Sequence, residues 1–342
     1  MKAIVKVRPE VGGWELQDLP IPEIKSDELL VKVEATGICG SDRDVYDWAE
    51  PKQGLPLPFT MGHEFFGEVV AVGDNVKGYA VGDKIASDSH IPCGECYLCR
   101  TGKRHLCMVH GILGHHVNGC FAEYIALPAV AAFKMPQDTK PEEGALMEPM
   151  GVVYHAVTRA EVSGKSVLVM GLGALGYIMV DAVRNMGASR VIVCSTNDAK
   201  LEKMLAEGAD FAINSKKEDV VAKVMEYTNG HGADVIFEMT GVQRLYDLSI
   251  DSAAYGGAMV CVGVPTETVQ MGQYFNRVMA KELVITGSFG RLFYETWELM
   301  RDLMEMKKIV PSKYVGKLYP LEEFEQALQD ARSTMGRVIL IP

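Results

Sequence analysis

The sequence predicts an α/β protein in which a β-rich first part is followed by a doubly wound parallel sheet. Over residues 1–150 of the 342-residue chain, short β-branched runs alternate with turns that contain proline and glycine. After Glu148 the pattern changes, because strand-like runs alternate with amphipathic helical stretches, as in the βαβ units of a parallel sheet. We therefore expect a first domain over 1–150 and a second domain that begins at 151.

Three runs are the clearest strand candidates of the first part, and turn segments separate them. The strand candidates are AIVKV at 3–7, ELLVKVEATGI at 28–38 and GEVVAVG at 67–73. The turn segments are LPIPE at 19–23 and VGDNVKGYAVGDK at 72–84. β-branched residues fit a pleated strand, whereas proline and glycine favour the turns between strands.

Four of the eight cysteines lie close together in HIPCGECYLCRTGKRHLC. In a reducing compartment, clustered thiols more often bind a metal than form disulfides, although coincidence and two redox pairs are alternatives. Thiolates suit tetrahedral zinc, and the spacing C-x2-C-x2-C-x7-C lets one loop surround a single ion. Because four thiolates leave zinc no open position, we expect a structural site. The predicted ligands are Cys93, Cys96, Cys99 and Cys107.

The segment 165–195 predicts a strand, a glycine turn, a helix and a second strand in succession. Further strand candidates, with helical stretches between most of them, lie at 210–214, 233–241, 257–265 and 282–289. From about Arg291 the chain carries two helical stretches and a last strand, at 293–306, 322–333 and 336–342. These C-terminal segments could extend the parallel sheet or return to the first part.

The glycine turn GLGALG directly follows a strand and opens a helix, which is the context that a dinucleotide-binding turn requires. Gly171 permits the tight turn, Gly173 lets backbone amides approach a pyrophosphate, and Gly176 allows close packing of helix on strand. We therefore expect NAD or NADP to bind here. The turn comprises Gly171, Leu172, Gly173, Ala174, Leu175 and Gly176.

The end of the next strand bears on the choice between the two cofactors. NAD-binding proteins carry an acid there that binds the ribose hydroxyls, but this chain has Ser195 and no carboxylate until Asp198. Ser195 and Thr196 could hydrogen-bond a 2′-phosphate, and Lys200 lies one helical turn beyond. We therefore favour NADP, and a hydrogen bond from Ser195 to the ribose of NAD is the alternative.

Three polar clusters of the first part, GICGSD, GHEFFGE and LMEPMG, have the chemistry that the four-cysteine loop lacks. They offer one thiolate, one imidazole and one or two carboxylates, from Cys39, His63, Glu64 and Glu148. Such a donor set binds zinc and keeps a position open, as a catalytic metal requires. Singly, each residue also fits a buried free cysteine, a hydrogen-bonded histidine or an exposed glutamate. Their joint presence before a dinucleotide-binding turn favours the zinc site.

These motifs, in this order over nearly the whole chain, resemble the zinc-dependent medium-chain alcohol and polyol dehydrogenases. Within that family, SHIPCGECYLCRTGKRHLC, GCFAEYIALPA, GVPTETV and FGRLFYETW are most similar to L-threonine 3-dehydrogenases. The resemblance implies a GroES-like β domain over 1–150, completed by 291–342, and a Rossmann domain over 151–290. It also implies a homo-oligomer, either a tetramer or a dimer.

The resemblance further implies that the protein oxidises a polar secondary alcohol, such as a polyol or a β-hydroxy amino acid, to a ketone, and catalyses the reverse. Cys39 and His63 match ligands of the catalytic zinc. Glu64 matches a ligand that can bind or release the metal, and Glu148 matches a fourth ligand or a relay carboxylate. We expect Ser41 to pass the proton toward solvent. The positions that match cofactor contacts are Leu175, Ser195, Lys200, Val262, Gly263, Val264, Ser288 and Phe289.

Asp44 departs from the threonine dehydrogenases, which carry a relay histidine in the segment after the zinc-binding cysteine. A carboxylate titrates differently from an imidazole and could face a different substrate group, so we do not assume that threonine is the substrate. His90 still matches the threonine enzymes. We expect His115 and His116 to be loop residues rather than ligands.

The net charge of −11 offers no basic surface for nucleic acid or an anionic membrane, so small molecules are the expected partners. No leader pattern opens the printed sequence and no apolar run approaches the ~20 residues that span a bilayer, so we expect a cytoplasmic protein. Two alternatives remain, a zinc-free reductase of the same fold and a non-catalytic dinucleotide-binding protein. Zinc content separates them, because a zinc dehydrogenase of this kind holds about two ions per chain, a non-catalytic variant about one, and a reductase none.

Overall fold

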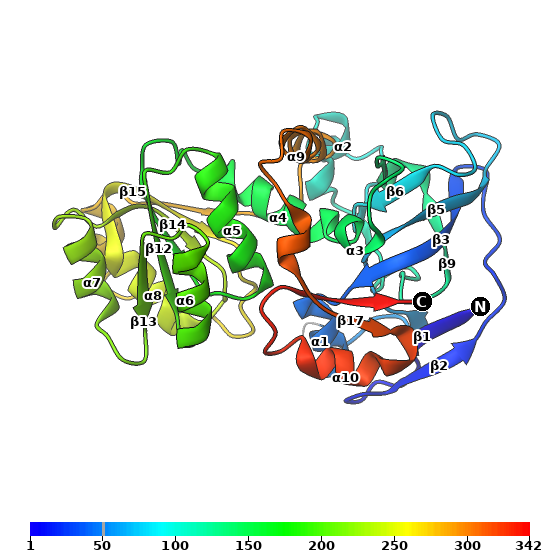
Figure 1. Cartoon of the computed structure of the whole chain (residues 1–342), viewed down its shortest axis with the longest axis horizontal. Helices are drawn as coiled ribbons and strands as arrows, with labels where there is room; N and C mark the ends of the chain where they lie inside the picture. Colours follow the sequence, from blue (N-terminus) through cyan, green and yellow to red (C-terminus); the bar gives the residue numbers. More distant parts are fainter. Residues whose placement is uncertain (50–51) are drawn as a thin grey trace. The chain divides into compact units, whose positions relative to one another are not determined.

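The computed structural model describes residues 1–49 and 52–342, which form two compact units (Figure 1). The first unit comprises Met1–Gly151, Gly290–Asp302 and Val310–Pro342. The second unit comprises Val152–Phe289 and Leu303–Ile309. The segment Leu303–Ile309 belongs to the second unit, where the side chain of Asn185 donates a hydrogen bond to the carbonyl of Lys308 at 3.0 Å.

A seven-stranded sheet lies at the centre of the first unit. Its order is β10-β6-β5-β3-β18-β17, and β9 also pairs with β3. The strands are β3 (Glu28–Gly37), β5 (Glu64–Val72), β6 (Lys84–Ser87), β9 (Tyr124–Pro128), β10 (Ala132–Lys134), β17 (Val315–Pro320) and β18 (Arg337–Ile341). The C-terminal strand β18, red in Figure 1, pairs antiparallel with β3 and parallel with β17. The C-terminal strands thus return to the first unit and do not extend the parallel sheet.

Two smaller sheets and several helices complete the first unit. The remaining strands are β1 (Lys2–Lys6), β2 (Trp14–Asp18), β4 (Phe59–Thr60), β7 (His90–Ile91) and β8 (Gly111–Ile112). The helices are α1 (Gly40–Tyr46), α2 (Tyr97–Arg100), α3 (Pro141–Gly144) and α10 (Phe324–Asp330), together with α4 (Met147–Val157) and α9 (Glu295–Glu305), which contain residues of both units. The core packs around Phe324 of α10, whose ring lies 5.0 Å from Trp14 and 5.5 Å from Phe121 between centroids.

The pairing of β3 with β5 positions the polar clusters of the first part. β5 begins at Glu64, earlier than the run at 67–73 predicts, because the buried residues Phe65 and Phe66 continue the strand. Glu64 then lies directly opposite Gly37 on β3, and β3 ends just before Cys39. The start of one strand and the end of its antiparallel neighbour therefore bring Cys39, His63 and Glu64 to one place.

A six-stranded parallel sheet forms the second unit, in the order β13-β12-β11-β14-β15-β16. Its strands are β11 (Ser166–Met170), β12 (Arg190–Ser195), β13 (Phe211–Asn214), β14 (Ala233–Glu238), β15 (Ala253–Cys261) and β16 (Val284–Gly287). The helices between them are α5 (Ala174–Asn185), α6 (Asp198–Ala206), α7 (Val220–Tyr227) and α8 (Gln243–Ser252). β11 is buried along its whole length, as a central parallel strand covered on both faces must be.

The strand order of this sheet also places a ligand site. The chain runs outward from β11 through β12 to β13, and then returns to β14 on the other side of β11. Such a topological switch point is where open parallel sheets bind ligands, outside the carboxyl ends of the strands. The predicted α/β fold with a doubly wound parallel sheet is confirmed.

Candidate metal centres and dinucleotide-binding site

The structure brings Cys39, His63 and Glu64 together, and one ligand atom of each lies within 4.8 Å of the other two. Cys39 precedes α1, and its backbone N–H donates to the carboxylate of Asp42 at 2.7 Å. A Cβ atom on Gly37 would lie 2.3 Å from Glu64 Oε2, so only glycine leaves room for that carboxylate. The local chain is therefore shaped to gather these three donors.

Charged side chains surround this centre on two sides. Asp42, which is fully buried, places Oδ1 3.4 Å from Nδ1 of His63. Arg337, at the start of β18, places Nε 3.0 Å from Oε2 of Glu64, an ion-pair separation whose angle does not make a hydrogen bond. Burial alone would raise the pKa of Cys39, but His63 and Arg337 lower it to about 6. Burial raises the pKa of Glu64 well above its usual value, although Arg337 opposes that shift.

The donor set at this centre fits a zinc ion. A thiolate, an imidazole and a carboxylate are three of the ligand types that zinc prefers, and three protein ligands leave a position open. Both carboxylate oxygens of Glu64 and Nδ1 of His63 are buried without a hydrogen-bond partner. Buried polar atoms are rarely left so, and a cation held between them would satisfy the carboxylate.

Glu148 lies outside this group of three, because a buried arginine holds its carboxylate. Arg291 Nη1 lies 2.6 Å from Glu148 Oε1, and Nε and Nη2 of the same guanidinium donate to Asp88 at 3.1 and 2.6 Å. All three residues are at least 95% buried. The charge of Glu148 still contributes to the raised pKa of Glu64. Nothing in the sequence around Arg291 predicts this bridge.

The other polar residues predicted around the centre lie on α1 and in two neighbouring segments. Ser41 and Asp44 belong to α1, and partial burial raises the pKa of Asp44. His90, on β7, donates its backbone N–H to Asp88 at 2.9 Å. His115 and His116 lie in a turn, as expected for loop residues, but His115 is only 4% exposed and its ring centroid lies 5.7 Å from that of His63.

The four-cysteine loop forms a second cluster with metal-binding geometry. The Sγ atoms of Cys93, Cys96, Cys99 and Cys107 lie within 4.8 Å of one another. The measured separations are 3.5, 3.9 and 4.0 Å, close to the ~3.8 Å expected around tetrahedral zinc with Zn–S bonds of about 2.3 Å. A disulfide would bring two sulfurs to about 2.05 Å, and all eight cysteines are free. The loop therefore fits a closed four-thiolate site.

The glycine turn of the second unit has the shape that dinucleotide binding requires. Gly171 has φ 105°, and a Cβ there would lie 2.3 Å from the side chain of Thr240. A Cβ on Gly176 would lie 2.0 Å from the carbonyl oxygen of Gly171, whereas Gly173, the N-cap of α5, has open space around it. The open position lets a phosphate approach the first backbone amides of α5. Leu172 lies in the turn, and Ala174 and Leu175 begin α5.

The end of β12 carries the residues that the sequence predicts to select between the two cofactors. Ser195 Oγ accepts the N–H of Asn197 at 3.3 Å, and Thr196 is exposed. Lys200 is half-buried, and burial alone lowers its pKa. The carboxylate of Asp198 is bound by Lys217 and Asn214, at 2.5 and 2.6 Å.

Arg244 reaches the same place from α8 and was not predicted from the sequence. Its Nη2 donates to the carbonyl of Ser215 at 2.8 Å, and the N–H of Ser215 donates to the carbonyl of Ser195 at 3.0 Å. The remaining predicted cofactor residues follow the carboxyl ends of β15 and β16. They are Val262, Gly263, Val264, Ser288 and Phe289.

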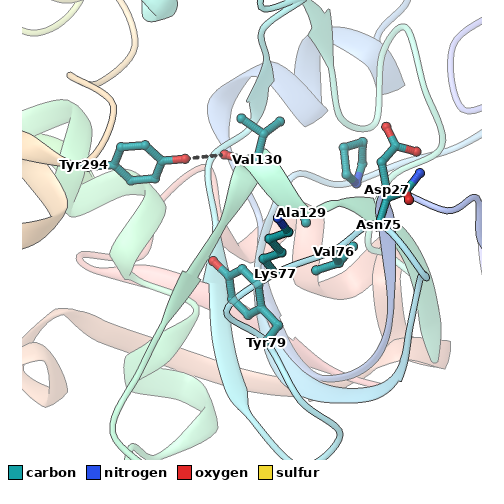
Figure 2. A pocket seen from close by; sticks show the side chains of 9 residues that line it. Asp27, Asn75, Val76, Lys77, Tyr79, Ala129, Val130 and Tyr294 are labelled. Atoms are coloured by element: carbon teal, nitrogen blue, oxygen red, sulfur yellow. Dashed lines mark hydrogen bonds between the residues drawn. The ribbon is translucent and has the colours of Figure 1, made fainter.

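A separate hollow of about 350 Å³ lies in the first unit (Figure 2). Its wall includes Asp27, Lys77, Tyr79 and Tyr294, and the Tyr294 hydroxyl donates to the carbonyl of Val130 at 3.3 Å. Its lining contains none of the predicted site residues, so we assign it no role. Among the described residues, no helix is long and apolar enough to cross a membrane.

Comparison with known proteins agrees with this geometry. Residues 25–137 match the alcohol dehydrogenase GroES-like domain, and residues 174–306 match the zinc-binding dehydrogenase domain. L-threonine 3-dehydrogenases of Shewanella woodyi and Aeromonas hydrophila are 35% and 37% identical, each over 99% of both chains.

Two solved structures are similar over the whole chain. A zinc-binding dehydrogenase from Sinorhizobium meliloti bound to NADP is 31% identical, with a TM-score of 0.91 over 100% of this chain and 99% of that one. Galactitol-1-phosphate dehydrogenase from Escherichia coli is 29% identical, with a TM-score of 0.92 over 100% of both chains. The resemblance seen in the sequence is thereby confirmed, and the chain belongs to the zinc-dependent medium-chain dehydrogenases, which oxidise alcohols with NAD or NADP.

Proposed function

We propose that Cys39, His63 and Glu64 hold the catalytic zinc of a dehydrogenase that acts on a polar secondary alcohol. The observation that carries this proposal is the meeting of a thiol, an imidazole and a carboxylate within 4.8 Å, with both carboxylate oxygens of Glu64 buried and without a hydrogen-bond partner. A zinc-free reductase or a non-catalytic protein would have no use for this centre. Four thiolates at Cys93, Cys96, Cys99 and Cys107 hold a second, structural zinc.

The residues around the centre then have separate tasks. When bound, zinc lowers the pKa of the substrate hydroxyl and the nicotinamide accepts the hydride from the same carbon. Asp42 orients His63 through its Nδ1 side, as second-shell carboxylates do. Arg337 balances the charge of Glu64, which can therefore bind or leave the metal without being left buried and unpaired. Ser41, on the first turn of α1, passes the proton toward solvent.

In this proposal, Glu148 is not one of the side chains that hold the zinc before substrate binds. Its bond with Arg291 supports that assignment, because Arg291 already donates a hydrogen bond to Glu148 at 2.6 Å, whereas neither carboxylate oxygen of Glu64 has a hydrogen-bond partner. In this proposal Glu148 acts as a relay carboxylate or as a transient fourth ligand.

The first test replaces His63 by alanine. An open zinc site without its imidazole loses Lewis acidity, so we expect no dehydrogenase activity, unchanged circular dichroism, and a fall from about two zinc ions per chain to about one. His231→Ala, at an exposed histidine of the second unit, is the matched control and should leave both quantities unchanged. A folded and active His63→Ala protein would contradict the catalytic-zinc assignment.

We also propose that NADP is accepted at least as well as NAD. No carboxylate stands at Ser195 to repel a 2′-phosphate, and Lys200 and Arg244 offer positive charge from two elements. The Asp198 carboxylate nearby is already neutralised by Lys217. The NADP-bound relative from Sinorhizobium meliloti is consistent with this preference.

We propose the substrate as a chemical class, the polar secondary alcohols. The threonine dehydrogenases among the relatives favour L-threonine as one candidate, and Asp44 in place of the relay histidine argues against it. A panel of L-threonine, other β-hydroxy amino acids, polyols and simple secondary alcohols, each with both cofactors, decides between these candidates. A kcat/KM for L-threonine well above every other value would identify the chain as an L-threonine 3-dehydrogenase.

We further propose a homo-oligomer, a dimer or a tetramer, with β16 at an interface. β16 is an edge strand, and the apolar side chains of Phe275, Met279 and Val284 on and beside it are 58–66% exposed. Unpaired edges and apolar patches of this kind normally become covered. Light scattering after chromatography should give a dimer or tetramer mass for the wild type and a smaller species for Phe275→Asp. The eight free thiols are in keeping with a cytoplasmic location.

A further inference from the structure

Glu238, the last residue of β14, is a fully buried acid that no step described above uses. Its Oε1 accepts the N–H of Thr240 at 2.9 Å and the hydroxyl of the same residue, and its Oε2 accepts the N–H of Gly241 at 3.0 Å. All three donors lie in the turn that follows β14, and none of them is a cationic side chain. Because acids are almost never fully buried without a cation, this one requires an explanation in the turn that it binds.

This turn packs against two segments that are predicted to contact the cofactor. On one side, a Cβ on Gly171 would lie 2.3 Å from Cγ2 of Thr240. On the other side, a Cβ on Gly263 would lie 2.3 Å from the backbone nitrogens of both Thr240 and Gly241. Contacts as close as these mean that a movement of the turn would also move its neighbours on both sides.

The segment after β15 is tied to the same turn by its backbone. Gly241 has φ 75°, and a Cβ there would lie 2.4 Å from the carbonyl oxygen of Val264. The N–H groups of Val262 and Gly263 donate to the carbonyl of Glu238 at 2.9 and 3.0 Å. Glu238 therefore binds the turn through its carboxylate and the segment after β15 through its carbonyl.

The strand order places these segments under one half of the cofactor. The pyrophosphate is expected at the glycine turn after β11, and the adenosine is expected beside Ser195 at the end of β12. A dinucleotide crosses the sheet at the switch point between β11 and β14. Its nicotinamide half then lies over the carboxyl ends of β14 and β15, where Glu238 and its hydrogen-bond partners stand.

We propose that Glu238 is a positioning residue for the nicotinamide half of the cofactor. Its carboxylate holds the turn 239–241 in one conformation, and the turn fixes Gly263 and Val264 before the cofactor arrives. A site that is ordered in advance loses less conformational entropy on binding. This inference rests on the proposed function, because it uses the predicted place of the cofactor on the sheet, and it goes beyond that function by naming what builds the place.

The test replaces Glu238 by glutamine, which keeps the volume and one acceptor oxygen but cannot accept the N–H of Gly241 at its amide nitrogen. The fraction of protein with an ordered turn should fall, and the affinity for cofactor should fall with it. We expect the Kd of NADPH, measured by its fluorescence, and the KM for NADP to rise about 10- to 100-fold, while kcat at saturating cofactor changes less than about threefold. Glu238→Ala, which removes both oxygens, should raise the Kd further.

Two controls separate positioning from a general loss of structure. Adenosine 2′-monophosphate carries neither pyrophosphate nor nicotinamide, so its Kd, measured by calorimetry, should be the same in wild type and Glu238→Gln. Asp234→Asn is the matched control at the other end of β14, where Oδ2 of Asp234 accepts the N–H and the hydroxyl of Ser166 at 2.8 and 2.7 Å. This control should lower the midpoint of thermal unfolding and leave the Kd of NADPH unchanged.

An unchanged Kd of NADPH in Glu238→Gln would overturn the inference, and so would an equal weakening of NADPH and adenosine 2′-monophosphate, or an equal weakening of NADPH in Asp234→Asn. If Glu238→Gln does not fold, Thr240→Val carries the test, because it removes only the hydroxyl donor and should raise the Kd of NADPH by a smaller factor; no rise would overturn the inference. NADH and adenosine replace the two probes if the wild type binds NADH alone. Failure of the proposed function differs from all of these outcomes, because the wild type would then bind neither NADPH nor NADH.

Discussion

Replacing Arg291 by alanine should destabilise the first unit far more than the loss of an exposed arginine. The side chain of Arg291 is 1% exposed, and its two carboxylate partners, Asp88 and Glu148, are 2% and 5% exposed. Removing one partner from a buried ion pair costs about 3–5 kcal/mol, because it leaves an uncompensated charge in the interior. We expect a loss in that range, since Asp88 keeps the N–H of His90 at 2.9 Å as a donor when the guanidinium is gone.

The three tryptophans make the measurement specific, because Trp14, Trp48 and Trp297 all belong to the first unit. Urea unfolding of the zinc-loaded protein, followed by tryptophan fluorescence, therefore reports the free energy of unfolding of that unit. Arg8→Ala is the matched control: Arg8 also pairs with two carboxylates, at 2.8 and 2.7 Å, but its side chain is 50% exposed. Its loss should destabilise the unit far less than the loss of Arg291, because water screens an exposed ion pair.

A double-mutant cycle with Glu148→Gln isolates the interaction free energy between Arg291 and Glu148. If Arg291 chiefly neutralises Glu148, the double variant should be more stable than Arg291→Ala alone, with a coupling energy of about 1–3 kcal/mol. A destabilisation of Arg291→Ala no larger than that of Arg8→Ala would refute the reasoning, since the bridge would then add nothing beyond a surface ion pair.

Three further predictions concern the structural loop, the cofactor pocket and acid stability. Cys96→Ala should lower the midpoint of thermal unfolding and the zinc content, because structural zinc contributes directly to folding; unchanged values of both would contradict a scaffold role for the loop. Ser195→Asp should raise the ratio of kcat/KM with NAD to kcat/KM with NADP by at least about tenfold, because charge-assisted bonds to the 2′-phosphate, worth roughly 1.5–3 kcal/mol each, would be lost. A wild type that prefers NAD by more than tenfold would show that Ser195 is only a neutral ribose contact. Burial alone would raise the pKa of Asp88, but the Arg291 guanidinium and the His90 side chain hold it well below its usual value. The stabilisation from the Asp88 carboxylate is therefore complete above the unfolded pKa of about 3.9 and is lost as the pH falls below it. Urea unfolding should therefore show a difference between wild type and Asp88→Asn that is constant above about pH 5 and shrinks below pH 4, and a difference that does not vary with pH would exclude this linkage.

The features that the sequence predicted well are those that residues close together in the chain determine. The glycine turn at Gly171 and the four-cysteine loop are each specified by residues a few positions apart, so their spacing carries the geometry. The alternation of strands and helices likewise predicted the parallel sheet of the second unit.

The features that the sequence did not predict depend on pairing between distant segments. Arg291 meets Glu148 across 143 residues, and Arg337 meets Glu64 only because β18 pairs with β3. No local pattern distinguishes either arginine from a solvated surface residue. The burial of His115, which lies in a turn as expected, follows from the packing of Gly114 and Gly119 on Gly62, which spacing alone does not reveal.

The position of β18 has a consequence for how the protein is made. This strand, the last of the chain, supplies Arg337 to the centre built by Cys39, His63 and Glu64, and lies against Thr36 and Gly37 of β3. At about 5–20 residues per second, a ribosome needs roughly 15–60 s to pass from β3 to β18. Throughout that interval Glu64 lacks its counter-charge, and the whole parallel sheet is synthesised before Arg337 is added. If Cys39, His63 and Glu64 hold zinc as proposed, the centre is therefore complete only after β18 has emerged, and removal of β18 would leave Glu64 buried without its counter-charge.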